Sequence, residues 1–214
     1  MYDLHTHTLH SDGELLPIEL VRRAAVLGYT TLGITDHVDA SNISQVIEAT
    51  CAVREEAASY GVFLLCGVEI THVPPAHIAD LANRARREGA DLVIVHGETA
   101  VEPVAPGTNR AACTCAEVDV LAHPGFITPD EAKEAAAHGV AIEITARGGH
   151  NRTNGHVLSV AREAGCTIVV GSDAHGPQDL MTATARRVVA MGAGMSKEEC
   201  ERVLSFDARG WLKP

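Results

Sequence analysis

Short apolar runs rich in β-branched residues recur along the chain, and a segment with helical spacing follows each of them. The runs are almost continuously hydrophobic, which is typical of parallel strands buried on both faces. The expected strands are Met1–Leu4, Thr31–Thr35, Val62–Ile70, Asp91–Val95, Val118–Ala122, Val140–Thr145 and Thr167–Gly171. Strands that alternate with helices in this way predict a parallel sheet with helical crossovers.

The segments between these strands have helical spacing and recognisable ends. The expected helices are Pro17–Leu27, Asn42–Tyr60, Pro75–Glu88, Pro129–Ala137, Gly155–Ala164, Gln178–Met191 and Ser196–Leu204. Proline suits the first turn of a helix, and glycine after the last turn is a common stop signal. We therefore expect an α/β fold, a TIM-like (β/α) barrel made of one domain over residues 1–214, with an open doubly wound sheet as the alternative.

One segment, residues 98–117, interrupts this alternation. Pro103, Pro106 and Gly107 stand where a regular crossover helix is expected. A loop of this length inside a compact domain is often functional. We expect either a lid or binding loop here or an irregular crossover.

Composition excludes several kinds of partner. The chain has 17 basic and 28 acidic residues, a formal net charge of −11, and no run rich in lysine or arginine. Duplex nucleic acid is therefore not an expected partner, because duplex-binding proteins present a basic surface. No stretch approaches the roughly 20 apolar residues that span a bilayer, and the first residues lack the pattern of a signal peptide. We expect a cytoplasmic protein without a membrane partner, and the sequence carries no signal for an oligomeric state.

Charged and metal-liganding residues cluster where the strands are expected to end. They are His5, His7, Asp12, Asp36, His37, Glu69, His96, His123, Arg147, Asp173 and His175. In a parallel barrel the carboxyl ends of the strands meet on one face, and the active sites of such barrels are built there. His5 and His7 are two residues apart on an extended segment, so both imidazoles point to the same side.

This mixture of residue types suits particular metals. Histidine nitrogens combined with carboxylate oxygens favour zinc, manganese or iron, whereas magnesium and calcium prefer oxygen ligands. The candidates are numerous enough for two or three divalent ions. Two ions about 3.5–4 Å apart, bridged by a carboxylate and a hydroxide, can hold the attacking and leaving oxygens of a phosphoryl group. Glu69 is the expected bridging carboxylate, because a glutamate can offer one oxygen to each ion.

Six short motifs occur in order along the chain. They are DLHTHTLHSDG at 3–13, ITDH at 34–37, GVEI at 67–70, VHGE at 95–98, AHPG at 122–125 and GSDAH at 171–175. Together they resemble the successive motifs of the polymerase-and-histidinol-phosphatase (PHP) family. The resemblance implies a distorted seven-stranded barrel with a trinuclear metal centre. It implies one ion at His5, His7, Glu69 and Asp173, a second at Glu69, His96 and His123, and a third at Asp12, His37 and His175.

Arg147 directly follows the sixth expected strand, so its guanidinium should reach the same face. The planar guanidinium can hold two phosphate oxygens at once, and histidinol-phosphatase-like members of the family place an arginine here. The resemblance therefore implies a metal-dependent phosphoesterase that acts on a small phosphomonoester and releases inorganic phosphate. Histidinol phosphate is the first candidate substrate. The hypothesised attack comes from the hydroxide that bridges the first two ions beside Glu69.

Two other functions stay open at this point. A phosphodiesterase or exonuclease acting on nucleotides would use the same ions, and a catalytically silent module would use them only for stability. The remaining histidines are expected outside the site. His72 and His77 lie at the start of a helix, and His150 and His156 flank a polar loop.

Overall fold

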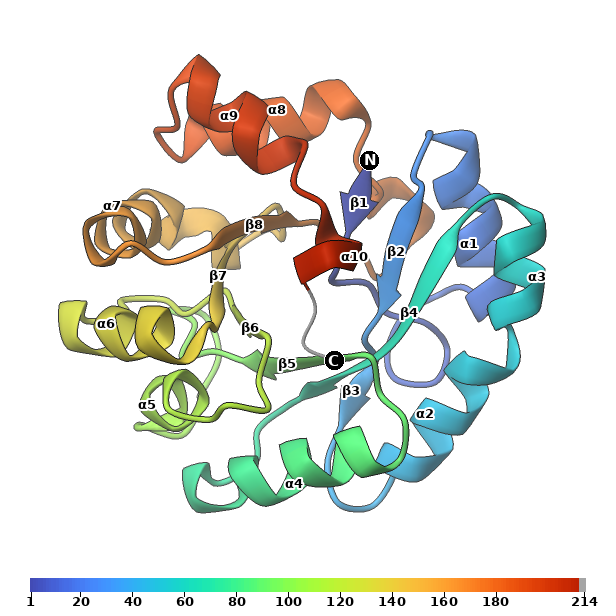
Figure 1. The fold of residues 1–214 in the computed structure, drawn as a ribbon, viewed down its shortest axis with the longest axis horizontal. Coiled ribbons are helices and arrows are strands. Elements are labelled where there is room, and N and C mark those ends of the chain that lie inside the picture. Colours follow the sequence, from blue (N-terminus) through green and yellow to red (C-terminus); the bar gives the residue numbers. More distant parts are fainter. Residues whose placement is uncertain (212–214) are drawn as a thin grey trace.

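The strands of the protein form a single parallel sheet that is rolled into a barrel and surrounded by helices (Figure 1). The computed structural model describes residues 1–211. The strands are β1 (Tyr2–Asp3), β2 (Thr31–Ile34), β3 (His37–Val38), β4 (Phe63–Ile70), β5 (Leu92–His96), β6 (Val120–Ala122), β7 (Ala141–Thr145) and β8 (Ile168–Gly171). They pair in the order β1-β2-β4-β5-β6-β7-β8, and β3 pairs with β4. The predicted α/β barrel is confirmed.

β2 and β3 occupy one position in the sheet, because both pair with the long strand β4. β2 pairs with the first half of β4, and β3 pairs with its last two residues, so that His37 lies opposite Glu69. Thr35 and Asp36 separate the two strands. The sheet therefore keeps the seven positions expected from the sequence, and β3 is a short continuation of the second.

The barrel is nearly closed between β8 and β1, where a few contacts replace a regular ladder. Thr6 and Ala174 form an isolated parallel bridge, and the His7 amide donates a hydrogen bond to the Ala174 carbonyl at 2.8 Å. Nearer the start of β1, Asp3 Oδ1 accepts a hydrogen bond from the Ser172 amide at 3.2 Å. This seam positions the chain that leaves β1 next to the end of β8.

Helices surround the sheet, and the last of them lies across the end of the barrel at which the strands begin (Figure 1). They are α1 (Pro17–Val26), α2 (Ile43–Ala52), α3 (Arg54–Ser59), α4 (Pro75–Arg87), α5 (Thr108–Cys113), α6 (Pro129–His138), α7 (Asn154–Ala164), α8 (Ala183–Gly192), α9 (Lys197–Leu204) and α10 (Ala208–Trp211), with the 3₁₀ turns η1 (His150–Thr153) and η2 (Pro177–Asp179). Within residues 1–211, no helix has the length and apolar character needed to cross a membrane.

Two helical predictions need correction. The helix expected over residues 42–60 is broken at Val53, whose backbone leaves the helical region (φ −98°, ψ 11°), and forms α2 and α3. The helix expected from Gln178 begins only at Ala183, because the Thr182 side chain caps it by accepting a hydrogen bond from the Ala185 amide.

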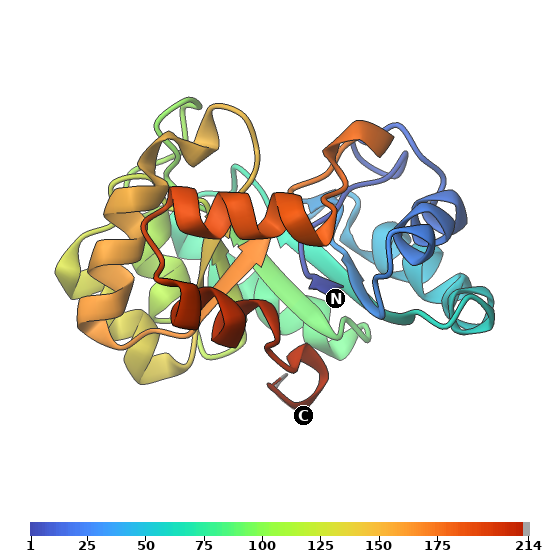
Figure 2. The same cartoon turned by 90° about the horizontal axis from the view of Figure 1, so that it is seen from above.

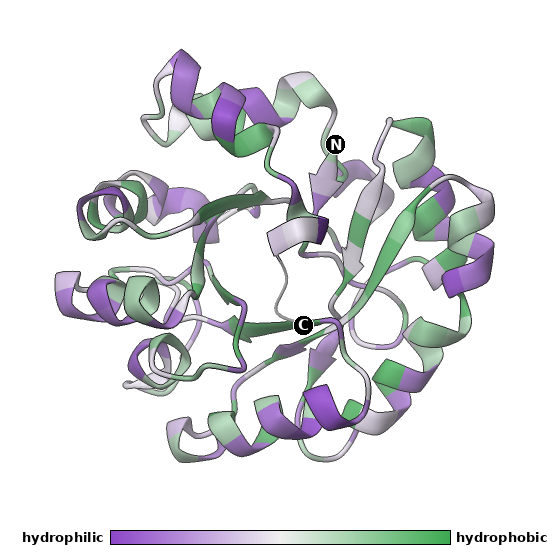
Figure 3. Cartoon of the chain, in the orientation of Figure 1, coloured by the Kyte–Doolittle hydropathy of each residue, from purple (hydrophilic) through white to green (hydrophobic). Residues whose placement is uncertain are grey.

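Apolar side chains fill the barrel interior as well as the layer beneath the helices, and β5 and β8 are among the most hydrophobic elements (Figure 3). Leu65, Leu92 and Ile94 point into the interior cluster and are at most 1 % exposed. Phe206 and Trp211 of the C-terminal segment pack on the same cluster, beside the N-terminus (Figure 2). The carboxyl ends of the strands stay open on the other side.

Candidate metal centre

The strand-end residues predicted from the sequence come together at the carboxyl ends of the strands. The buried ones, all at most 3 % exposed, are His5, His7, Glu69, His96, His123 and Asp173. His37 and His175 are partly exposed, and Asp12 is exposed. Burial of this many ionisable groups is costly unless something compensates their charge and satisfies their polar atoms.

The innermost group consists of His5, His7, Glu69 and Asp173. His5 Nε2 lies 3.3 Å from Glu69 Oε1, and His7 Nε2 lies 3.2 Å from Asp173 Oδ1 and 3.7 Å from Glu69 Oε2. These five atoms are buried without a hydrogen-bond partner among the described residues. A tetrahedral ion with bonds of about 2.0–2.1 Å keeps its ligand atoms about 3.3 Å apart. The residues therefore fit a divalent cation such as zinc.

Glu69 also reaches a further imidazole from the opposite side of the barrel. His123 Nε2 lies 3.6 Å from Glu69 Oε1 and 3.6 Å from Asp173 Oδ2. The ring of His96 is next, with its centroid 4.5 Å from that of His123. One carboxylate oxygen of Glu69, Oε1, thus faces both His5 and His123, and the bridging role expected from the sequence stays a prediction.

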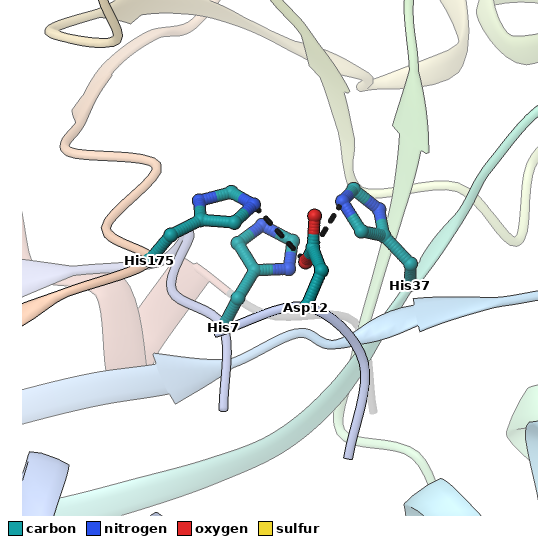
Figure 4. A group of neighbouring side chains, drawn as sticks. All are labelled: His7, Asp12, His37 and His175. Atoms are coloured by element: carbon teal, nitrogen blue, oxygen red, sulfur yellow. Dashed lines mark ion pairs between the residues drawn. The ribbon is translucent and has the colours of Figure 1, made fainter. Parts of the chain in front are cut away.

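A third group lies nearer the solvent and shares His7 with the innermost group (Figure 4). The Asp12 carboxylate stands between two imidazoles, with Oδ1 at 3.1 Å from His175 Nε2 and 3.5 Å from His37 Nε2. Partial burial would raise the pKa of Asp12, but His175 and His37 outweigh that effect and bring it to about 2. This carboxylate is therefore ionised at neutral pH.

The surrounding charges set the protonation states of the buried groups. Burial raises the pKa of the Glu69 carboxyl, but His5 and His37 outweigh burial and hold that pKa well below its usual range. Burial, reinforced by the neighbouring His96, lowers the pKa of His123. Metal ions bind ionised carboxylates and neutral imidazoles. Burial lowers the pKa of His5, but Glu143, Glu69 and Asp173 outweigh burial and raise that pKa well above its usual value, so a metal ion at this imidazole would displace a proton.

One buried carboxylate at the centre was not predicted. Glu143, in the middle of β7 and 1 % exposed, has Oε1 at 2.8 Å from His5 Nδ1, and its Oε2 accepts a hydrogen bond from the His123 amide at 3.0 Å. A Cβ at Gly171 would overlap this carboxylate, so the glycine provides its space. The sequence does contain a sign of this residue, because Glu143 is a single acidic residue inside the apolar run AIEIT. A buried carboxylate of this kind requires a polar partner.

Arg147 lies at the rim of the centre, and its role in phosphate binding stays a prediction. It lines a cavity of about 520 Å³ that also exposes His37, Asp173 and His175. Its Nη1 atom is 3.4 Å from Asp179 Oδ2, and the same oxygen accepts a hydrogen bond from the His175 amide. Asp179 thus holds the guanidinium close to the histidine groups.

Two histidines expected outside the site also face this cavity. His72 follows β4, and His150 begins η1; both contact the carboxylate of Glu102, which comes from the loop between β5 and α5. Neither histidine belongs to a recognised motif, so only the folded chain reveals their position.

Comparison with known proteins agrees with this geometry. The model of the PHP domain matches residues 3–174, which contain the first five motifs in full and the sixth as far as Ala174. The chain belongs to the PHP family. The resemblance found in the sequence is therefore confirmed for this PHP protein.

Three known proteins illustrate what this PHP protein is similar to. An uncharacterized protein of Methanocaldococcus jannaschii is 46% identical over 214 residues, which cover 99% of this chain and 98% of that protein. Ribonuclease P protein component 3 of Methanosarcina barkeri is 28% identical over 98% of this chain and 90% of its own length. The histidinol phosphate phosphatase of Lactococcus lactis, solved with zinc, L-histidinol and phosphate, shares the fold with a TM-score of 0.64 at 16% identity, covering 91% and 94% of the two chains.

Proposed function

We propose that this PHP protein is a metal-dependent phosphoesterase that hydrolyses a small phosphomonoester. The observation that carries the proposal is the convergence of buried, unpartnered ligand atoms from His5, His7, Glu69 and Asp173 beside the cavity that Arg147 lines. A cavity of about 520 Å³ accommodates a small phosphorylated metabolite.

In this proposal, two or three ions of the zinc, manganese or iron class bind at three sets of residues. The first set is His5, His7, Glu69 and Asp173, the second is Glu69, His96 and His123, and the third is Asp12, His37 and His175. When bound, the ions would supply positive charge and water with a pKa lowered to about 7.

The side chains of the protein have complementary tasks. Glu69 Oε1 faces both His5 and His123, so this carboxylate could serve both sets of residues. Glu143 holds His5 so that its Nε2 faces Glu69. Arg147 would bind two non-bridging oxygens of the substrate phosphoryl group, with Asp179 restricting its guanidinium. Developing negative charge on the phosphoryl oxygens would then meet fixed positive charge.

Histidinol phosphate is the first substrate to test, because the structurally similar Lactococcus lactis enzyme was solved with L-histidinol and phosphate. A second candidate is a phosphodiester or the end of an RNA strand. It is favoured by the similarity, over 98% of this chain, to a protein component of ribonuclease P.

Elemental analysis and a substrate panel test the proposal together. The purified protein would be loaded with zinc or manganese and assayed on histidinol phosphate, p-nitrophenyl phosphate, bis-p-nitrophenyl phosphate and a 5′-phosphorylated oligoribonucleotide. We expect more than one ion per chain and higher activity on the monoesters, with loss of activity in Glu69→Gln.

The other outcomes separate the alternatives. Faster cleavage of the diester or oligonucleotide would favour the nuclease function. Ions that stabilise the fold without turnover of any substrate would favour the silent module. Less than one ion per chain under metal-replete conditions would overturn the proposal.

A further inference from the structure

A second cluster of histidines surrounds a carboxylate at the outer edge of the centre. Glu102 Oε2 lies 3.2 Å from His96 Nε2 and 3.3 Å from His72 Nε2, and Glu102 Oε1 lies 3.3 Å from His150 Nε2. These separations equal the distance of about 3.3 Å between ligand atoms of a tetrahedral ion with bonds of about 2.0–2.1 Å. The ligand atoms of His72, His96 and Glu102 all lie within 4.8 Å of one another.

His96 is oriented to use the ring nitrogen that faces this cluster. Its Nδ1 atom lies 3.1 Å from the Gly97 carbonyl, an acceptor, so the ring proton belongs on Nδ1. The lone pair of Nε2 then points toward Glu102. A metal-bound histidine commonly donates its other ring N–H to a carbonyl in this manner.

The backbone of His72 gives independent support. Its φ is 53°, in the left-handed region that non-glycine residues rarely adopt. Within residues 1–211, only His123 and Asp173 share a positive φ among the non-glycine residues, and both belong to the proposed centre. Backbone strain of this kind concentrates at active sites and ligand clamps. His72 thus shares a positive φ with two proposed ligands.

The loop that carries Glu102 is fixed at its base. Glu98 Oε1 accepts hydrogen bonds from the amides of Gly107 and Asn109, both at 2.9 Å. The Asn109 side chain in turn donates to the Pro124 carbonyl at 2.8 Å. Residues 99–106 therefore leave and rejoin the barrel at defined points, with Glu102 directed at the histidines.

We propose that Glu102 and His72 are ligands of the divalent cation that His96 holds, so that binding of this cation fastens the loop of residues 99–106 over the open face. Three nitrogen and oxygen donors of this type suit a zinc-class ion. His150 orients the Glu102 carboxylate through its second oxygen. The inference rests on the proposed function, because it assigns His96 to a metal ion.

Cobalt(II) titration tests the assignment without measuring catalysis. The wild-type protein, Glu102→Gln and His72→Gly would be titrated, with the visible cobalt absorption and chelator competition as readouts. Glycine adopts a positive φ without strain, so His72→Gly removes the imidazole without burdening the fold. Glu134→Gln and His138→Gly change an exposed glutamate and histidine that contact each other elsewhere and serve as controls.

We expect each test variant to weaken the binding of one cobalt ion at least tenfold and to change its spectrum, while the controls match the wild type. Hydrogen exchange of residues 99–106 should slow on cobalt binding in the wild type and much less in Glu102→Gln. Affinities within twofold of the wild type in both variants, or tighter binding by Glu102→Gln, would overturn the inference. If the wild type still binds metal and hydrolyses a phosphoester in that case, only the inference about Glu102 and His72 is wrong. A wild-type protein that binds no cobalt would overturn the proposed function as well.

Discussion

Replacement of Glu143 by glutamine tests how the buried carboxylate of β7 positions the centre. The two groups that face it are His5 Nδ1 at 2.8 Å and the His123 amide at 3.0 Å. When Nε2 of His5 binds a cation, Nδ1 carries the proton, so both groups are donors. A glutamine of the same size offers one acceptor oxygen, and its amino group must face the other donor.

The size of the effect of Glu143→Gln depends on which of the two donors loses its hydrogen-bond partner. A buried unsatisfied polar group costs about 1–3 kcal/mol. If the His5 ring turns away, the cost appears as weaker metal binding by about 5- to 150-fold, because each 1.4 kcal/mol is about tenfold. If the His123 amide is left unpaired instead, the same cost lowers the free energy of unfolding of the metal-free protein.

Chelator competition and urea unfolding together measure both possibilities. Glu19→Gln, at an exposed helical ion pair with Arg23, is the control and should change the free energy of unfolding by less than about 0.5 kcal/mol. Gly171→Ala should act in the same direction as Glu143→Gln, because its Cβ would displace the carboxylate. Unchanged metal affinity together with unchanged stability in Glu143→Gln would refute the reasoning.

Three further predictions follow from the same geometry. Metal ions at 100 times their dissociation constant should stabilise the fold by about 2.7 kcal/mol per site; a chelator should therefore lower the thermal midpoint and zinc restore it, and an unchanged midpoint would contradict a buried metal centre. Arg147→Lys keeps the charge but loses the fork, so KM for the phosphomonoester should rise about tenfold in steady-state assays; an unchanged KM would remove Arg147 from the phosphate site. Leu92→Ala opens a cavity in the barrel interior and should cost about 2–5 kcal/mol in urea unfolding, with the metal stoichiometry preserved.

The sequence predicted the barrel well because each buried parallel strand is a continuous apolar run. It did not predict β3, which has only two residues and depends on distant contacts. Asp36, just before β3, accepts hydrogen bonds from the Thr8 amide at 2.7 Å and the Ser11 hydroxyl at 2.6 Å. The short break between β2 and β3 is thus held by residues that precede Asp36 by 25 and 28 positions in the sequence.

The sequence indicates which residues lie at the strand ends, and therefore which side chains face the candidate site. It does not indicate how far along the barrel axis each of them lies. Glu69 pairs with Ile94, two residues before His96, so His96 starts about 6–7 Å farther along the strand direction than Glu69. His37, by contrast, lies opposite Glu69. An imidazole at this level lies beside His123 and also faces groups beyond the end of the sheet. The loop carboxylate of Glu102 meets it there, which no motif at a strand end could indicate.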